Sequence, residues 1–276
     1  MIECITVSWL NRFSYFYVVI VMASLWHSSA VSNESDNTTV KFCVPQNDFY
    51  PFFITRDNLL TGINPELVRQ IFNDKSLQGV TVEFDRRPWK RCNADLEKGN
   101  VDMMIGGFDE NRINVVYPHD LGFALTNSAI STADVCFSSI TGRQMDAVKR
   151  GLLEKSPFSV GIEPGFTKKH HDDIAPEWLV LFNPKEKYRM LELGRIDAIV
   201  QVCQMDGKFA IETQSEAIGF SRFETVHPPY LSNPAYIVFS KDFAAHYNTL
   251  AKTIISLSTR LDKTAIYNQY KPKNRP

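Results

Sequence analysis

Short apolar runs alternate along the chain with stretches whose apolar residues recur at helical spacing. Residues 63–72 place their apolar side chains on one face of a helix. The expected strands are the apolar runs at residues 40–44, 80–84, 101–105, 158–162, 179–182, 196–202 and 236–239. Strands that alternate with helices predict an α/β fold with mostly parallel sheets. The segment 250–270 predicts one or two amphipathic helices.

Two Asn-Pro pairs mark expected helix starts. Asn64 precedes Pro65, and Asn183 precedes Pro184. Asn accepts a hydrogen bond from a free amide of the first turn, and Pro gives up only an amide that has no partner there. We therefore expect helices capped by Asn64 and Asn183. The Lys-Glu-Lys run at residues 185–187 predicts exposed helix charges.

A short pattern occurs twice along the chain. Leu-Glu-x-Gly-x-Val/Ile-Asp ends at Asp102 and again at Asp197, and each copy is followed by an apolar run. Gly99 and Gly194 stand where a helix would end, a position that suits the left-handed conformation of glycine. The apolar runs are typical of parallel strands covered on both faces. We expect two α/β lobes of similar build, with both aspartates in structural roles at strand starts.

The first thirty residues have the layout of a secretory signal. A lead with one base, Arg12, is followed by an apolar stretch from Phe13 to Trp26 and by small residues ending at Ala30. The stretch is shorter than the ~20 residues of a spanning helix, which favours a cleaved signal over a membrane anchor. We expect residues 1–30 to be a cleaved signal peptide for export, and residues 31–39 to be a disordered leader.

The net charge and the number of cysteines narrow the class of protein further. The chain has 276 residues and a formal net charge of -1. Nucleic-acid-binding chains are usually strongly basic, so this balance argues against such a partner. Removal of the signal would take Cys4 away and leave four of the five cysteines. An even number in an exported chain indicates disulfides.

The motifs stand in the order of one protein family. They are Tyr50-Pro51-Phe52, the G-x-N-P-E-L run from Gly62, Trp89 at the second helix, Gly99–Asp102, Asp109–Arg112, Tyr117-Pro118, Val160–Gly165, Gly194–Asp197 and Tyr236–Lys241. Over about residues 40–272, the chain resembles the bacterial periplasmic solute-binding proteins of polar amino-acid transporters, family 3. The resemblance implies the type 2 two-lobed fold, in which each lobe is a mostly parallel sheet flanked by helices.

The resemblance also implies an organisation and a function. Lobe 1 would comprise residues 40–127 and 231–272, lobe 2 would be the insert 128–230, and two crossings would form a hinge. The protein would be a non-catalytic monomer, without cofactor or metal, that closes on a small molecule with a carboxylate. It would serve an inner-membrane ABC permease or a membrane sensor. The alternative is an enzyme on the same fold, similar to a dehydratase.

Two segments are candidates for binding the carboxylate. Arg112 follows a turn after a buried strand, and a guanidinium can hold a carboxylate through two parallel hydrogen bonds. The resemblance assigns it to the ligand's α-carboxylate. The turn of Gly165, Phe166 and Thr167 would offer free amides to the same group from the other lobe. A surface arginine and a plain strand-to-helix turn are the alternatives.

Aromatic residues gather near the expected cleft. They are Phe49, Tyr50, Phe53 and Trp89. Tyr and Trp can cover the apolar part of a ligand and still form a hydrogen bond at one edge. We expect Tyr50 and Trp89 to face the ligand, with core packing as the alternative for each.

The sequence does not identify which residue would pair with an ammonium group of the ligand. Family members commonly carry an Asp at the position that Val202 occupies here, next to Gln201. The ligand is therefore either an amino acid held by Asp206 or Glu163, or a carboxylate that lacks an amino group. Under the enzyme alternative, Glu163 and Asp206 would be the candidate acid and base.

The hinge implied by the resemblance limits which cysteines can pair. Four cysteines allow three pairings, and a bridge between the lobes would oppose closure. We therefore expect Cys43–Cys92 and Cys136–Cys203, with two free buried thiols as the alternative for the second pair. The His-containing run at residues 168–173 predicts a solvated surface rather than a metal site, because adjacent histidines point in different directions.

Overall fold

The computed structural model describes residues 38–163, 176–181, 183–217, 219 and 223–272. The expected signal peptide, most of the expected leader, the turn 165–167 and the run 168–173 lie outside these residues. β1 begins at Thr38, so the last two residues of the expected leader belong to a strand. None of the described helices is long and apolar enough to cross a membrane.

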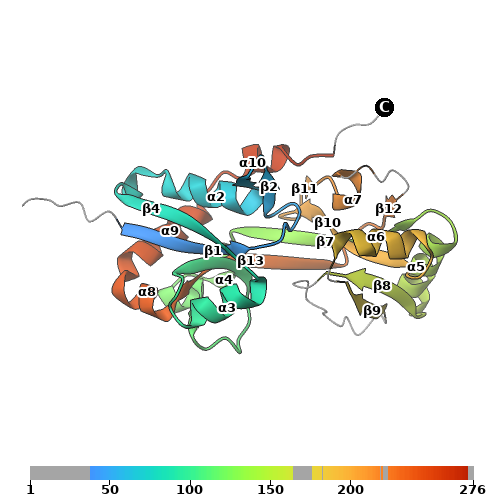
Figure 1. The fold of residues 1–276 in the computed structure, drawn as a ribbon, viewed down its shortest axis with the longest axis horizontal. Coiled ribbons are helices and arrows are strands. Elements are labelled where there is room, and N and C mark those ends of the chain that lie inside the picture. The colour runs from blue at the N-terminus through green and yellow to red at the C-terminus, as the bar shows by residue number, and fades with distance from the viewer. Residues whose placement is uncertain (1–37, 164–175, 182, 218, 220–222, 273–276) are drawn as a thin grey trace, which may run out of the picture. The chain divides into compact units, whose positions relative to one another are not determined.

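Strands and helices alternate along the described chain (Figure 1). The strands are β1 (Thr38–Pro45), β2 (Ile54–Arg56), β3 (Leu59–Thr61), β4 (Val80–Arg87), β5 (Met103–Gly107), β6 (Val115–Val116), β7 (Ser131–Ile140), β8 (Phe158–Ile162), β9 (Pro176–Val180), β10 (Ala198–Met205), β11 (Phe209–Ala210), β12 (Phe223–Thr225) and β13 (Leu231–Ser240). The helices are α2 (Ile63–Phe72), α3 (Trp89–Glu97), α4 (Leu125–Ser128), α5 (Arg143–Glu154), α6 (Pro184–Glu192), α7 (Gln214–Ala217), α8 (Lys241–His246), α9 (Asn248–Thr259) and α10 (Thr264–Asn268), with 3-10 turns η1 (Lys75–Leu77) and η2 (Pro118–Leu121).

An 11-stranded sheet has the main order β4-β1-β5-β13-β7-β10-β8-β9. The strands toward each edge are parallel: β4, β1 and β5 on one side, and β10, β8 and β9 on the other. Between them, β13 and β7 run antiparallel to each other and to their other neighbours. The α/β class and the parallel arrangement of the outer strands are confirmed.

Side chains of alternate residues in β1 enter two different cores. Phe42 and Val44 pack with buried residues of α2 and α9, whereas Cys43 packs with α3. This alternation is the period of two expected for a strand covered on both faces. The sheet therefore has helices on both sides here (Figure 1).

The repeated Leu-Glu-x-Gly-x-Val/Ile-Asp pattern makes the same contacts in both copies. Asp102 Oδ2 accepts a hydrogen bond from the amide of Lys41 at 2.7 Å, and Asp197 Oδ2 accepts one from the amide of Ser159 at 2.8 Å. In return, the Asp102 amide donates to the Lys41 carbonyl at 3.0 Å and the Asp197 amide to the Ser159 carbonyl at 2.9 Å. Each aspartate thus joins the start of its strand to the neighbouring parallel strand, and the predicted structural role is confirmed.

The start of α2 differs from the prediction. The helix begins at Ile63 after Gly62, and Asn64 lies inside the first turn with 4% of its surface exposed. Gly62 has a φ of 112°, and a Cβ there would lie 2.5 Å from the Phe52 carbonyl oxygen. Because this close turn already directs the chain into the helix, the cap predicted for Asn64 is wrong. By contrast, α6 begins at Pro184, directly after Asn183 as expected.

The pattern misplaced β9 and missed β7, as well as the short strands β2, β3, β6, β11 and β12. β9 spans Pro176–Val180 rather than 179–182, since its ladder with β8 ends at the pair Ile162 and Val180. β7 was not expected, because its sequence STADVCFSSI contains several polar residues. Among the buried ones, the Ser139 hydroxyl donates to a carbonyl and Asp134 accepts from the Gly207 amide at 2.8 Å. The Ser131 hydroxyl has no hydrogen-bond partner among the described residues.

Both expected disulfides are present. Cys43–Cys92 joins β1 to α3 with a Cα–Cα distance of 5.6 Å. Cys136–Cys203 joins β7 to β10 with a Cα–Cα distance of 5.8 Å. The predicted pairings are confirmed, and the alternative of two free thiols is wrong.

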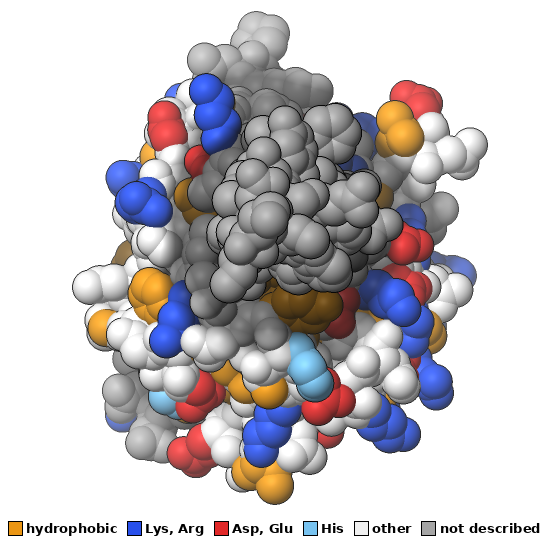
Figure 2. Space-filling view, turned by 90° about the vertical axis from the view of Figure 1, so that its left-hand side faces the viewer, with side chains coloured by type: hydrophobic (Ala, Val, Ile, Leu, Met, Phe, Trp, Pro, Cys, Tyr) orange, Lys and Arg blue, Asp and Glu red, His pale blue; other side chains and the backbone are white. Residues whose placement is uncertain are grey.

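The charged side chains of one face can be followed in Figure 2, which views the side at the left of Figure 1. On the described part of this face, Lys and Arg are interspersed with Asp and Glu. A nucleic-acid backbone requires a field of positive charge. This face therefore offers no such field, in keeping with the formal net charge of -1.

Candidate functional site

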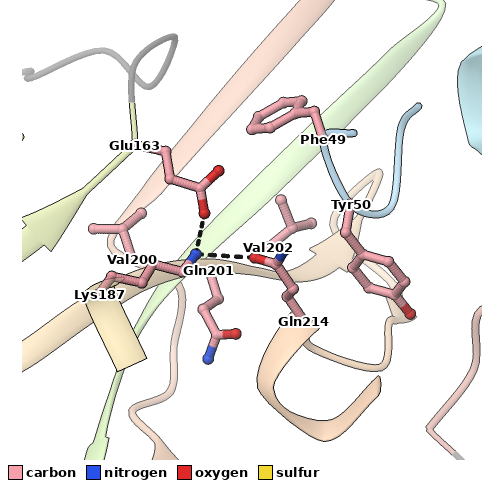
Figure 3. Close-up of a pocket in the computed structure, with 8 residues that line it drawn as sticks. All are labelled: Phe49, Tyr50, Glu163, Lys187, Val200, Gln201, Val202 and Gln214. Carbon is pink, nitrogen blue, oxygen red and sulfur yellow. Dashed lines mark hydrogen bonds and ion pairs between the residues drawn. The ribbon is translucent and has the colours of Figure 1, made fainter. Parts of the chain in front are cut away.

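A small pocket lies where the loop before β2 meets β8, β10, α6 and α7. Its lining consists of Phe49, Tyr50, Glu163, Lys187, Val200, Gln201, Val202 and Gln214 (Figure 3). About 10 Å³ is open to the centre of a water molecule, which is room for about one water. In this conformation the pocket is therefore too small for an amino acid.

Strand and turn geometry bring the lining together. Glu163 directly follows β8, and Gln201 lies in the middle of the neighbouring strand β10. Ligand sites in open α/β sheets commonly lie beyond the carboxyl ends of parallel strands. Facing them, Phe49 exchanges backbone hydrogen bonds with Phe53 at 2.7 and 2.9 Å. This narrow turn holds Phe49 and Tyr50 over the pocket (Figure 3).

A buried ion pair forms the polar centre of the pocket. Lys187 Nζ donates to Glu163 Oε1, and the side chains are only 2% and 9% exposed. Lys187 Nζ also donates to Gln214 Oε1 at 3.0 Å. The prediction that Lys187 is an exposed helix charge is wrong. Lys187 lies one helical turn before the fully buried Leu191, on the inner face of α6.

Burial sets the protonation chemistry of this centre. Desolvation lowers the pKa of Lys187, and the carboxylate of Glu163 opposes that shift. Burial raises the pKa of the neighbouring Tyr188, and the charge of Glu163 raises it further. The tyrosine therefore stays neutral and keeps its proton for hydrogen bonding.

The ion pair continues into a chain of amides and hydroxyls. The Tyr188 hydroxyl lies 3.1 Å from Gln214 Oε1 and 3.3 Å from Gln201 Oε1. Gln201 Nε2 donates to Ser215 Oγ at 2.8 Å, and the Ser215 amide donates to Gln201 Oε1 at 2.8 Å. A satisfied buried network of this kind fixes side-chain positions. Gln201 is thus a lining residue with a fixed orientation.

The aromatic side of the pocket is neutral. Burial raises the pKa of the Tyr50 hydroxyl, and the charge of Glu212 adds to the rise. The Tyr50 ring makes an edge contact with Tyr270, with ring centroids 6.3 Å apart. Phe53 is 3% exposed and belongs to the core, whereas Phe49 and Tyr50 are half-buried and line the pocket.

Arg112 lies outside this lining. Its side chain is 13% exposed, and Nε is 3.5 Å from Glu97 Oε1. Nε and Nη2 are buried and have no hydrogen-bond partner among the described residues. Unpaired buried donors are costly, about 1–3 kcal/mol each. The guanidinium therefore retains donors that an anion could satisfy.

Two other expected site residues have different surroundings. Trp89 opens α3 and packs against the core around Cys43 and Cys92. Asp206 Oδ1 accepts from the Thr132 amide at 2.7 Å, and Oδ2 accepts from Lys263 Nζ and the Tyr267 hydroxyl at 3.2 and 3.1 Å. Neither residue lines the pocket. The structure brings Tyr50, Glu163 and Gln201 together, and Lys187 and Gln214 are the lining residues that the sequence reading missed.

Residues 42–116 match the model of the bacterial extracellular solute-binding proteins, family 3. The resemblance to family 3 solute-binding proteins is confirmed. This matched segment runs from β1 to β6 and includes Tyr50, Trp89 and Arg112. No match was found among curated proteins.

Solved structures of such proteins share the fold. The probable amino-acid ABC transporter extracellular-binding protein of Bacillus subtilis is 13% identical, with a TM-score of 0.62 over 84% of this chain and 95% of that one. A substrate-binding protein of an amino acid ABC transporter is 16% identical, with a TM-score of 0.55 over 84% and 96%. An ancestral amino-acid-binding protein, a precursor of cyclohexadienyl dehydratase, is 18% identical, with a TM-score of 0.57 over 84% and 92%. The fold is therefore the type 2 two-lobed fold.

Proposed function

We propose that the protein binds a small polar solute by closing two lobes around this pocket. The observation that carries the proposal is the buried pair of Lys187 and Glu163, which faces Phe49 and Tyr50 across the pocket (Figure 3). A charged pair opposite an aromatic wall suits a small molecule with a polar end and an apolar end. The confirmed resemblance to family 3 supports binding as the activity.

The proposed lobes have the boundaries expected from the sequence. Lobe 1 comprises residues 40–127 and 231–272, and lobe 2 comprises residues 128–230. β7 and β13 would form the hinge, since they pair from Leu231 opposite Val135 to Ala235 opposite Ser131. Neither disulfide joins one proposed lobe to the other. Closure would therefore meet no covalent restraint from them.

The proposed ligand is an amino acid or another small carboxylate. Val202 adds no charge to the pocket, and Glu163 is already paired with Lys187. An ammonium would have to share Glu163 with Lys187, whereas a carboxylate would find donors on Arg112 that have no hydrogen-bond partner among the described residues. Because the pocket holds about one water, the ligand would enter a more open form.

The proposed setting follows from the family. Residues 1–30 would direct the protein to the periplasm as a cleaved signal peptide. There it would act as a monomer, without cofactor or metal, and pass its ligand to an inner-membrane ABC permease or present it to a membrane sensor. Two structural relatives are binding proteins of amino-acid ABC transporters, which supports the permease.

A thermal-shift screen of amino acids and small carboxylates tests the proposal. A ligand at 100 times its dissociation constant stabilises the folded protein by about 2.7 kcal/mol. Hits are then titrated calorimetrically against wild type and Lys187→Gln, with the exposed Lys149→Gln as the matched control. The proposal fails if no compound of either class stabilises the protein, or if both variants bind every hit as wild type does.

An enzyme of the dehydratase class is a second candidate. Glu163 and Lys187 are an adjacent acid and base in a pocket, a common feature of catalytic sites. One structural relative is a precursor of cyclohexadienyl dehydratase. Incubation with a cyclohexadienyl carboxylate that carries a hydroxyl group, followed by chromatography, tests for loss of that hydroxyl as water. A catalytic role for Glu163 predicts that Glu163→Gln binds this substrate but forms no product.

A further inference from the structure

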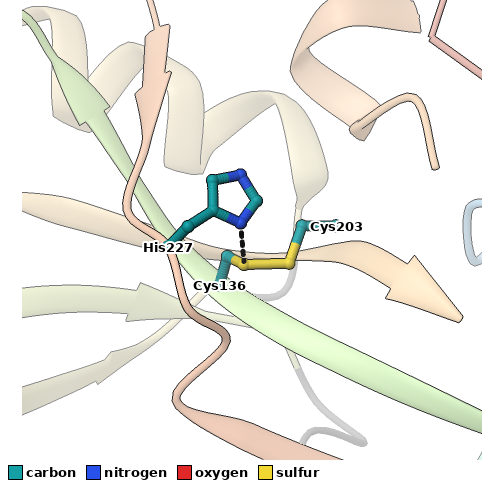
Figure 4. Close-up of side chains that lie close together, drawn as sticks. All are labelled: Cys136, Cys203 and His227. Carbon is teal, nitrogen blue, oxygen red and sulfur yellow. Dashed lines mark hydrogen bonds between the residues drawn. A yellow bond between two sulfur atoms is a disulfide. The ribbon is translucent and has the colours of Figure 1, made fainter. Parts of the chain in front are cut away.

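A second cluster of reactive side chains lies outside the pocket lining. Cys136 and Cys203 form a disulfide, and Nδ1 of His227 lies 3.9 Å from Sγ of Cys136 (Figure 4). The three candidate ligand atoms all lie within 4.8 Å of one another. Both cysteines are buried, whereas His227 is exposed. The cluster thus has two covered sulfur atoms and one ring that solvent can reach.

The backbone holds the three residues together independently of the disulfide. β7 and β10 are paired at Cys136 opposite Gln201 and at Val135 opposite Val202. The segment that carries His227 is joined to β7 on either side of Cys136. The Val226 amide donates to the Phe137 carbonyl at 2.8 Å, and the Tyr230 amide donates to the Val135 carbonyl at 3.0 Å. Cleavage of the sulfur–sulfur bond would therefore leave the three side chains as neighbours.

Their spacing suits a tetrahedral metal site. Zinc binds sulfur at about 2.3 Å and histidine nitrogen at about 2.0–2.1 Å, which places sulfur and nitrogen about 3.6 Å apart and two sulfurs about 3.8 Å apart. The distance of 3.9 Å from His227 to Cys136 is already close to this value. The sulfurs would have to separate, and the Cα–Cα distance of 5.8 Å allows this by side-chain rotation.

We propose that reduction of Cys136–Cys203 creates a binding site for Zn²⁺, with two thiolates and the His227 imidazole as ligands and water as the fourth. With a phosphine as the reductant, phosphorus gives two electrons to the disulfide and takes oxygen from water, and the two sulfurs take up two protons. Zn²⁺ then displaces both thiol protons and binds Nδ1 of His227, whose ring proton remains on Nε2. Because two protons are released, the affinity for Zn²⁺ depends on pH. Below the pKa values of the two thiols, it falls by up to about 100-fold for each unit by which the pH is lowered.

The other disulfide offers an internal comparison. Cys92 Sγ lies 3.5 Å from the Val44 carbonyl oxygen, deep in the core beside α3. Within the described residues, Cys136, Cys203 and His227 are the one group of three potential metal ligands. Reduction of Cys43–Cys92 would therefore yield two thiols without a third ligand.

Site-resolved alkylation of the phosphine-reduced full-length protein tests the proposal. The protein is treated with iodoacetamide with and without Zn²⁺, and the modified cysteines are identified by mass spectrometry. Zn²⁺ is expected to protect Cys136 and Cys203 but not Cys43 and Cys92. His227→Ala is expected to lose this protection, with a fall in affinity of more than about tenfold. The Cys43→Ser/Cys92→Ser variant is expected to retain it.

Co²⁺ gives a second readout, since thiolate ligands produce charge-transfer absorption that the oxidised protein cannot show. Circular dichroism of the reduced protein checks that the chain stays folded. The proposal is overturned if Zn²⁺ protects no cysteine, protects Cys43 and Cys92 as well as Cys136 and Cys203, or protects Cys136 and Cys203 in His227→Ala as well as it does in wild type. An unfolded reduced chain gives the first or second of these results and counts against the site.

Discussion

Lys187 of α6 donates a hydrogen bond to Glu163, the residue that follows β8, and both side chains are at least nine-tenths buried. The two charges come from segments 24 residues apart. Removing two charges from water is costly, and their attraction offsets this only while both remain in place. Loss of either charge is therefore expected to destabilise the folded protein around the pocket.

Replacement of one partner is expected to destabilise the protein strongly. Lys187→Met leaves Glu163 buried without its counter-charge, which typically costs about 3–5 kcal/mol. Urea unfolding measures the loss. The double variant Lys187→Met/Glu163→Gln removes both charges and is expected to recover most of it. A single variant as stable as wild type would show that the two charges are not buried together in solution.

Arg112 is expected to contribute to the binding of a carboxylate ligand. Its Nε and Nη2 have no hydrogen-bond partner among the described residues, so they remain available to an anion. Loss of a buried charged partner costs about 2–5 kcal/mol of binding free energy. Titration calorimetry of Arg112→Ala with a hit from the screen measures this loss. The exposed Arg143 provides the control Arg143→Ala, and equal affinities of the two variants would contradict the assignment.

Asp102 and Asp197 are expected to affect stability but not affinity. Each carboxylate accepts a hydrogen bond from a backbone amide of the neighbouring strand. Asp197→Ala leaves the part-buried Ser159 amide without its acceptor, at a cost of about 1–3 kcal/mol in unfolding free energy. The Lys41 amide is exposed to water, so Asp102→Ala is expected to cost only about 0.5–1.5 kcal/mol. Urea unfolding and ligand titration of Asp102→Ala and Asp197→Ala measure the two quantities. A loss of affinity in a variant of normal stability would point to a direct role in binding.

Asp95 is expected to make stability depend on acid pH. Hydrogen bonds from Asn100, Arg87 and Arg91 lower its pKa from 3.8 to about 2. Between these values the unfolded chain binds more protons than the folded one, so the unfolding free energy rises with pH in this window. The contribution is full above about pH 4 and is lost as pH falls toward 2. Unfolding of Asp95→Asn across this range is expected to show a shallower slope than wild type.

Much of the fold could be predicted because its strands are buried on both faces. Mostly apolar runs identified β1, β8 and β10, and the two glycines of the repeat marked the ends of α3 and α6. β7 escaped because buried serines and an aspartate interrupt its apolar pattern. Several of them are paired with groups distant in sequence, such as Asp134 with the amide of Gly207. Local pattern carries no information on such contacts.

The pocket was harder to predict than the fold. Tyr50 was expected as an aromatic residue near the cleft, Glu163 as a partner for a ligand ammonium, and Gln201 as the neighbour of Val202; all three line the pocket. Lys187 was missed because its charged neighbours in sequence suggested a surface. Its helical position, four residues before Leu191, was the available signal. Gln214 lies on the short helix α7, which has no strong periodicity of its own.

The two disulfides also define the covalent topology of the chain. They close separate rings, from Cys43 to Cys92 and from Cys136 to Cys203, which do not overlap in sequence. A protease cut inside either ring leaves its two products tethered until they are reduced. A cut between Cys92 and Cys136 instead divides the described chain into two pieces with no bond between them. Between Cys92 and Cys136, one cut in the main chain therefore yields two fragments, each with its own internal disulfide and no covalent bond to the other.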